Sequence, residues 1–171
     1  MRQAQIFIGI GLLVLLLAAL TGCTFGFDPG AANGIGGVQA TVTRVIDGDT
    51  IDVQIDGRKE RVRYIGVNTP ERDESCYQEA TDANSLLVKG KIVSLVSDAE
   101  DTDQYGRLLR YVYVGDLFVN KALVEQGFAE AVSYPPNTAH YDEFVRLEQD
   151  ATAGGRGCHP TGIFDDGSYT R

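Results

Sequence analysis

The chain has 171 residues, of which 43% are hydrophobic and 23% are charged, enough for one globular domain with its own core. The 24 acidic residues outnumber the 15 basic ones and give a net charge of −9. This balance excludes a protein that attracts nucleic acids through a generally basic surface, so any nucleic-acid site has to be local.

The first 22 residues have the pattern of a bacterial export signal. Arg2 is the only charge before residue 28, residues 6–20 are apolar apart from two glycines, and Leu-Thr-Gly precedes Cys23. This ending resembles a lipoprotein lipobox and predicts a lipid on Cys23. We therefore expect an exported protein, anchored to the cell membrane and facing outside the cytoplasm. The alternatives are an ordinary secretory signal and an uncleaved anchor, although the run is shorter than the ~20 residues of a membrane-spanning helix.

The glycine-rich residues 23–37 are predicted to form a flexible tether. Alternation of apolar and polar residues then predicts strands over residues 38–42 and 51–55. Asp56-Gly57 predicts a hairpin turn into a third strand that continues to Val67.

A helix is predicted over residues 75–90, with Ser75 and Gln78 as a capping box and Gly90 at its end. Two further strands are predicted, over residues 91–97 and 108–114. Two further helices are predicted over residues 119–126 and 138–153, and residues 159–171 are expected to be a loose tail. Five strands with a helix between the third and the fourth is the order of an OB-fold. The predicted fold class is therefore α+β, mainly β: a five-stranded Greek-key barrel with about three helices, over residues 38–158.

Acidic and amide side chains flank the second and third strands. Asp49 precedes strand two, whereas Asn68 and Glu71 follow strand three. Because the two strands are antiparallel about one turn, Asp49 should lie near Asn68 and Glu71. Hard oxygen ligands of this kind suit Ca²⁺ or Mg²⁺ rather than zinc. Two arginines complete the set: Arg63, and Arg107, which precedes the fifth strand. The guanidinium group of arginine is a planar cation that can bind two phosphate oxygens at once.

Each of these features also has an ordinary interpretation. Asp47-Gly48-Asp49 is compatible with a simple turn, and Arg63 with a surface strand residue. The acidic segment 101–103 lacks the glycine and glutamate of an EF-hand loop and is predicted to be solvated.

Taken together, these residues resemble the staphylococcal nuclease (thermonuclease) family over about residues 38–153. The resemblance is carried by residues 45–50, Arg63, and residues 69–71, 105–107 and 119–124. It implies a monomeric enzyme that hydrolyses DNA and RNA with Ca²⁺ and leaves 3′-phosphates.

The resemblance also assigns roles to individual residues. Asp49, the side chain at position 68 and the Thr69 carbonyl would bind Ca²⁺, with Asp47 supporting the loop. Glu71 would orient or deprotonate the attacking water. Arg63 and Arg107 would bind the phosphate. Tyr105 and Tyr134 would contact the nucleotide.

Asn68 departs from the family, which has an aspartate at this position. An uncharged amide is expected to lower Ca²⁺ affinity, or to shift the choice of metal. Two alternatives therefore stay open: a nuclease with altered metal use, and a catalytically silent OB module that binds nucleic acid or protein.

The two cysteines beyond Cys23 are Cys76 and Cys158. Outside the cytoplasm such a pair is predicted to form a disulfide. The alternative is a metal site that combines both thiols with His140 and His159.

Overall fold

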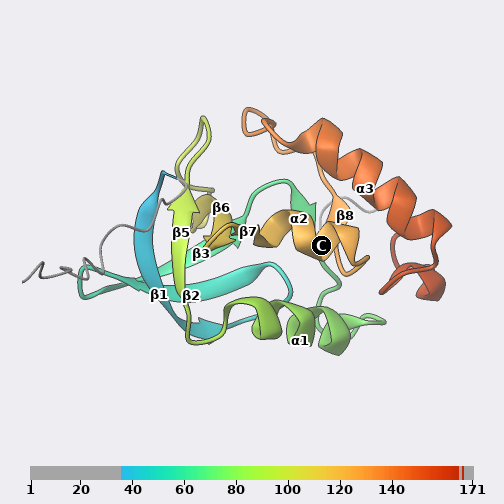
Figure 1. The fold of residues 1–171 in the computed structure, drawn as a ribbon, viewed down its shortest axis with the longest axis horizontal. Helices are drawn as coiled ribbons and strands as arrows, with labels where there is room; N and C mark the ends of the chain where they lie inside the picture. Colours follow the sequence, from blue (N-terminus) through green and yellow to red (C-terminus); the bar gives the residue numbers. More distant parts are fainter. Residues whose placement is uncertain (1–35, 166, 168–171) are drawn as a thin grey trace, which may run out of the picture. The chain divides into compact units, whose positions relative to one another are not determined.

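The computed structural model describes residues 36–165 and 167, so the predicted signal segment, Cys23 and nearly all of the tether lie outside the described residues. Five strands form a barrel (Figure 1). They are β1 (Val38–Val45), β2 (Thr50–Ile55), β3 (Arg58–Tyr64), β5 (Ile92–Val96) and β6 (Leu108–Val114). Neighbours pair in the order β3-β2-β1-β5-β6, and a parallel pairing of β3 with β6 closes the barrel. The predicted α+β class with a five-stranded OB barrel is confirmed.

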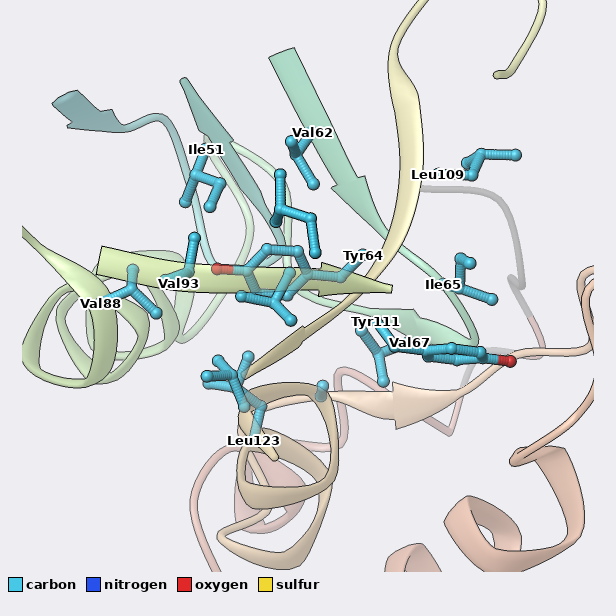
Figure 2. Close-up of a cluster of buried hydrophobic side chains, with 14 of the residues drawn as sticks. Ile51, Val62, Tyr64, Ile65, Val67, Val88, Val93, Leu109, Tyr111 and Leu123 are labelled. Carbon is cyan, nitrogen blue, oxygen red and sulfur yellow. The ribbon is translucent and has the colours of Figure 1, made fainter. Parts of the chain in front are cut away.

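The β2–β3 hairpin sets the register of the site. Asp56 and Gly57 both have positive φ, as the predicted tight turn requires, and Ile55 pairs with Arg58. At the far end of the same hairpin, Thr50 pairs with Arg63. Alternate residues of both strands point into the barrel, and Figure 2 shows this core with contributions from α1 and α2.

The third strand ends earlier than predicted. β3 stops at Tyr64, and the chain turns at Gly66, whose φ is +75°. A short strand, β4 (Val67–Asn68), then pairs with β8 (Glu130–Ala131) in a separate two-stranded sheet. The positive φ at this bend favours glycine, and a Cβ at Gly66 would make a tight contact of 3.1 Å with the Phe144 ring.

Three helices accompany the barrel: α1 (Tyr77–Val88), α2 (Val119–Glu125) and α3 (Tyr141–Ala153). The predicted capping box at Ser75 is wrong. Cys76 occupies the N-cap position with φ +68° and no side-chain cap, because the preceding loop and its disulfide bring the chain into the helix one residue later. Gly90, by contrast, ends α1 with positive φ as predicted.

Two smaller elements were not predicted. β7 (Leu117–Phe118) forms a hairpin with β6, and the 3₁₀ helix η1 (His159–Thr161) lies where a loose tail was expected to begin. Cys158 donates its backbone N–H to the Gly127 carbonyl at 2.8 Å, which holds the start of this segment against the end of α2. Within the described part of the chain, no helix has both the length and the apolar character needed to cross a membrane.

Candidate active site

The loop before β2 is held from two sides. The Asp47 carboxylate accepts the Asp49 backbone N–H at 3.1 Å, and the Asp47 carbonyl accepts the Asn84 side-chain amide at 2.9 Å. Asn84 lies on α1 and in turn accepts the Tyr64 hydroxyl at 2.9 Å. A Cβ at Gly48 would lie only 2.7 Å from the Thr69 side chain, so glycine allows the loop to approach β4 closely. The loop is therefore a packed part of the site and not a simple surface turn.

Asp49 is the centre of this arrangement and is only 5% exposed. Its Oδ2 accepts the Thr69 backbone N–H at 3.0 Å and the Thr69 hydroxyl at 3.1 Å, and it lies 3.2 Å from Arg63 Nη2. The proximity of Asp49 to the end of the third strand, predicted from the hairpin, is thus found in the structure.

Arg63 is 7% exposed, so the surface-arginine interpretation is wrong. Its Nη1 donates to the carbonyls of Tyr64 and Val67 at 2.8 and 2.7 Å. Its Nη2 donates to Asn68 Oδ1 at 3.2 Å and faces Asp49. The guanidinium therefore joins the start of β2 to β4. Two of the three oxygens expected to bind a metal, those of Asp49 and Asn68, lie against its Nη2.

Glu130 is a buried member of this cluster that the sequence did not reveal. It is 2% exposed, lies opposite Asn68 in the β4–β8 pair, and accepts the Asn68 amide at 2.9 Å. The only available signal was a glutamate within the otherwise apolar run that follows Gly127.

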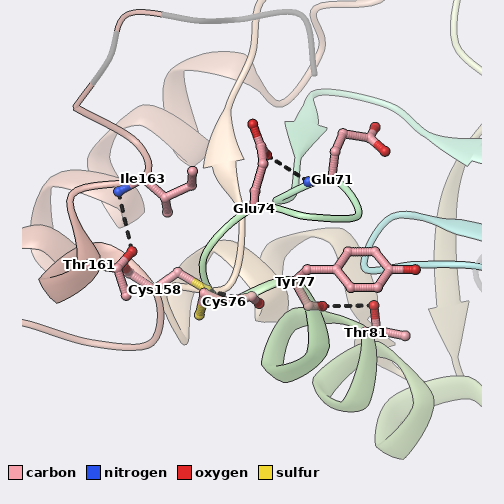
Figure 3. The surroundings of a disulfide bond; sticks show 8 residues. All are labelled: Glu71, Glu74, Cys76, Tyr77, Thr81, Cys158, Thr161 and Ile163. Atoms are coloured by element: carbon pink, nitrogen blue, oxygen red, sulfur yellow. Dashed lines mark hydrogen bonds between the residues drawn. A yellow bond between two sulfur atoms is a disulfide. The ribbon is translucent and has the colours of Figure 1, made fainter.

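Glu71 lies on the loop between β4 and α1 (Figure 3). Desolvation and the negative charge of Asp49 raise its pKa above the ordinary glutamate value, while the positive charges of Arg63 and Arg107 oppose this shift. The Glu71 backbone N–H donates to the Glu74 carboxylate at 2.7 Å, which shapes the loop.

The pKa of Asp47 is raised to about 7, first by burial and then by the neighbouring charge of Asp49. The hydrogen bond from the Asp49 N–H makes the Asp47 side chain an acceptor inside the loop, which agrees with the supporting place expected for it.

Arg107 reaches the site from the loop before β6, and a carboxylate orients it. Its Nε donates to Asp103 Oδ2 at 2.6 Å, and its guanidinium lies 5.4 Å from the Tyr105 ring centre. Burial by itself would raise the pKa of Asp103, but hydrogen bonds from Arg107 and Tyr105 lower it overall. The prediction that segment 101–103 is a solvated loop is confirmed for Asp101 and Thr102, which are exposed although Asp101 pairs with Arg110, but it is wrong for Asp103, whose side chain is 7% exposed.

Tyr105 and Tyr134 line the same surface pocket, which has a volume of about 300 Å³ and includes Asp103. Tyr105 is 75% exposed, which leaves its ring free to stack on a flat ligand. The structure thus brings the two tyrosines together beside the residue that orients Arg107.

The oxygen donors near Asp49 fit a hard divalent cation. Asp49 has a carboxylate oxygen and Asn68 an amide oxygen, and both are Ca²⁺ ligand types. Thr69, whose carbonyl the resemblance assigns as a further ligand, is held against Asp49 through its N–H and its hydroxyl. Within the described residues no three His, Cys, Asp or Glu side chains cluster to hold a metal.

Cys76 and Cys158 are joined in a disulfide, with their Cα atoms 5.6 Å apart. This pairing excludes the alternative metal site in which both thiols were ligands. As Figure 3 shows, the bond lies at the start of α1, directly after the loop that carries Glu71.

Comparison with known proteins agrees with this geometry. The family model described as "Staphylococcal nuclease homologue" matches residues 61–158. Endonuclease YncB of Bacillus subtilis (strain 168) is 43% identical over 122 residues, which are 67% of this chain and 58% of that protein. The SPbeta prophage-derived endonuclease YokF of the same organism is 41% identical over 122 residues, 67% of this chain and 41% of that protein. Thermonuclease of Staphylococcus intermedius is 41% identical over 116 residues, 64% and 69% of the two chains. The matched region thus covers less than two thirds of either Bacillus protein.

The disulfide gives a testable consequence for stability. Replacing Cys76 and Cys158 together by Ala should lower the free energy of unfolding by about 2–5 kcal/mol, because the bond closes a long loop in the unfolded chain. Urea unfolding, with and without reductant, measures this loss. The Cys23→Ser variant is the control for the remaining thiol and should respond to reductant like the wild type. Equal stability of the double variant and the wild type would contradict the expectation.

Proposed function

This chain belongs to the staphylococcal nuclease family, and we propose that it is a Ca²⁺-dependent nuclease that hydrolyses phosphodiester bonds of DNA and RNA to 3′-phosphate products. The observation that carries the proposal is one buried cluster: Asp49 and Asn68 lie against Arg63, and Thr69 donates to Asp49. The charges of Arg63 and Arg107 act on the neighbouring Glu71. A silent binding module has no use for this combination.

Asp49, Asn68 and the Thr69 carbonyl would hold the Ca²⁺, which when bound neutralises and polarises the phosphodiester. Arg63 is fixed by its hydrogen bonds, so its charge is preorganised at no further cost during the reaction. Arg107 is more exposed than Arg63 and can meet the phosphate of an incoming substrate. Tyr105 and Tyr134 would then take the base or sugar in the adjoining pocket.

Glu71 is the group that we assign to the attacking water. Burial and the charge of Asp49 raise the pKa of Glu71, which makes this carboxylate a better proton acceptor than an ordinary glutamate. Glu71 would take one proton from the water as the water oxygen attacks phosphorus, and the 5′ oxygen would leave as an alkoxide that takes up a proton from solvent water. The 3′-phosphate product follows from breaking that P–O bond.

An extracytoplasmic, lipid-anchored location is also part of the proposal. The disulfide supports an oxidising compartment. The anchor itself rests on the sequence around Cys23, which lies outside the described residues.

The wild-type chain is expected to cleave plasmid DNA and RNA with Ca²⁺ and to lose this activity in EDTA. Glu71→Gln should lower the rate by about 10²–10⁴-fold, because a neutral amide cannot accept the proton. Glu79→Gln, which removes the same charge from the first turn of α1, is the matched control and should keep the wild-type rate. Circular dichroism checks the fold of both variants. Activity in Glu71→Gln equal to the control would refute the role of Glu71, and cleavage undiminished by EDTA would refute metal dependence.

The anchor is tested by cell fractionation. Cys23→Ser should move the protein from the membrane fraction, because the serine hydroxyl cannot form the thioether that carries the lipid. Retention of Cys23→Ser in membranes at the wild-type level would show that another segment anchors the chain.

A further inference from the structure

The partner of Asn68 is a carboxylate whose burial needs an explanation. Glu130 Oε1 accepts the Asn68 amide at 2.9 Å, and the oxygen of the same amide accepts Arg63 Nη2 at 3.2 Å. Glu130 is 2% exposed, and a buried carboxylate is costly unless charges or donors compensate it. The three side chains form one continuous series, Glu130–Asn68–Arg63, that ends at the expected cation site.

This series decides which way the Asn68 amide faces. An amide has a donor end and an acceptor end, which exchange when the group rotates by 180°. The Glu130 carboxylate accepts the hydrogen bond of the amide, and Arg63 only donates hydrogen bonds. The orientation with the nitrogen toward Glu130 satisfies both, and it leaves the oxygen on the side of Arg63 and Asp49. The reverse orientation would point N–H donors at a cation.

Glu130 also supplies charge. Asn68 is neutral, so the oxygen set around Asp49 has one negative charge fewer than it would have with an aspartate at position 68. The Glu130 carboxylate lies one amide group behind that oxygen, and charge effects at such separations are substantial away from bulk water.

We propose that Glu130 is a positioning residue of the cation site: it orients the Asn68 oxygen toward the cation and provides the negative charge that position 68 lacks. This inference rests on the cation site of the proposed function. It concerns a residue on β8, 62 positions away in sequence from its partner.

The direct test is equilibrium Ca²⁺ binding to the full-length chain without substrate, measured by calorimetry. Glu130→Gln keeps the size of the side chain and an oxygen that can accept the Asn68 amide, but it removes the charge. The Kd for Ca²⁺ should rise by about 3- to 10-fold. Glu60→Gln, on β3, carries the same change in net charge and should stay within about twofold of the wild type.

A second pair of variants separates orientation from general damage. Asn68→Asp removes the amide donor and leaves two carboxylates, at positions 68 and 130, facing each other. Adding Glu130→Gln to this variant restores a hydrogen-bond donor, now at position 130. Glu130→Gln should therefore raise the melting temperature in the Asn68→Asp background, although it weakens Ca²⁺ binding on its own. The double variant should bind Ca²⁺ at least as tightly as the wild type.

The inference is overturned if the Kd of Glu130→Gln for Ca²⁺ matches that of the control. It is also overturned if Glu130→Gln changes the melting temperature equally in the wild type and in the Asn68→Asp variant. Plasmid cleavage by the wild type is measured in parallel. If the wild type cleaves DNA but the Kd values do not follow the expected pattern, only the role of Glu130 is rejected. If the Kd values follow the pattern but the wild type does not cleave, only the nuclease proposal is rejected. Absence of Ca²⁺ binding by the wild type rejects both.

Discussion

One buried cation, the guanidinium of Arg63, sets the constraint on which the site depends. A charge at this depth is tolerated only when hydrogen bonds and an opposite charge surround it. Its partners come from three places: Asp49 before β2, the Tyr64 and Val67 carbonyls at the bend after β3, and Asn68 on β4. The residues that we propose to bind phosphate and metal are therefore also the residues that neutralise one another.

The barrel makes this arrangement possible. β3 lies between β2 and β6, so the antiparallel hairpin brings Asp49 to Arg63, and the parallel pairing with β6 brings the loop of Arg107 to the same end. Behind the site, the fully buried Tyr64 donates to Asn84, which holds the Asp47 carbonyl. Burial raises the Tyr64 pKa, so the phenol stays a neutral donor. The core and the catalytic loop are thus connected by two hydrogen bonds.

The sequence predicted what depends on periodicity and local turns. Alternation marked the strands, Asp56-Gly57 fixed the hairpin, and the hairpin implied that Asp49 lies near Asn68. It did not reveal Glu130, because a two-residue pairing between distant segments leaves no periodic signal. It misassigned Asp103, because an acidic loop looks the same whether its carboxylates face water or backbone N–H groups. The cap of α1 was missed because a disulfide, not a side-chain hydrogen bond, defines that end.

The central claim, that a fixed guanidinium fork at position 63 assembles the nuclease site, is tested most directly by Arg63→Lys. Lysine keeps the positive charge but lacks the rigid, planar set of N–H donors of arginine. It therefore cannot donate to both backbone carbonyls, to Asn68 and to Asp49 at the same time. We expect Ca²⁺-dependent cleavage of plasmid DNA to fall by about 100-fold or more in this variant, while the circular dichroism spectrum keeps its barrel signature. A folded Arg63→Lys variant that cleaves at the wild-type rate would contradict it.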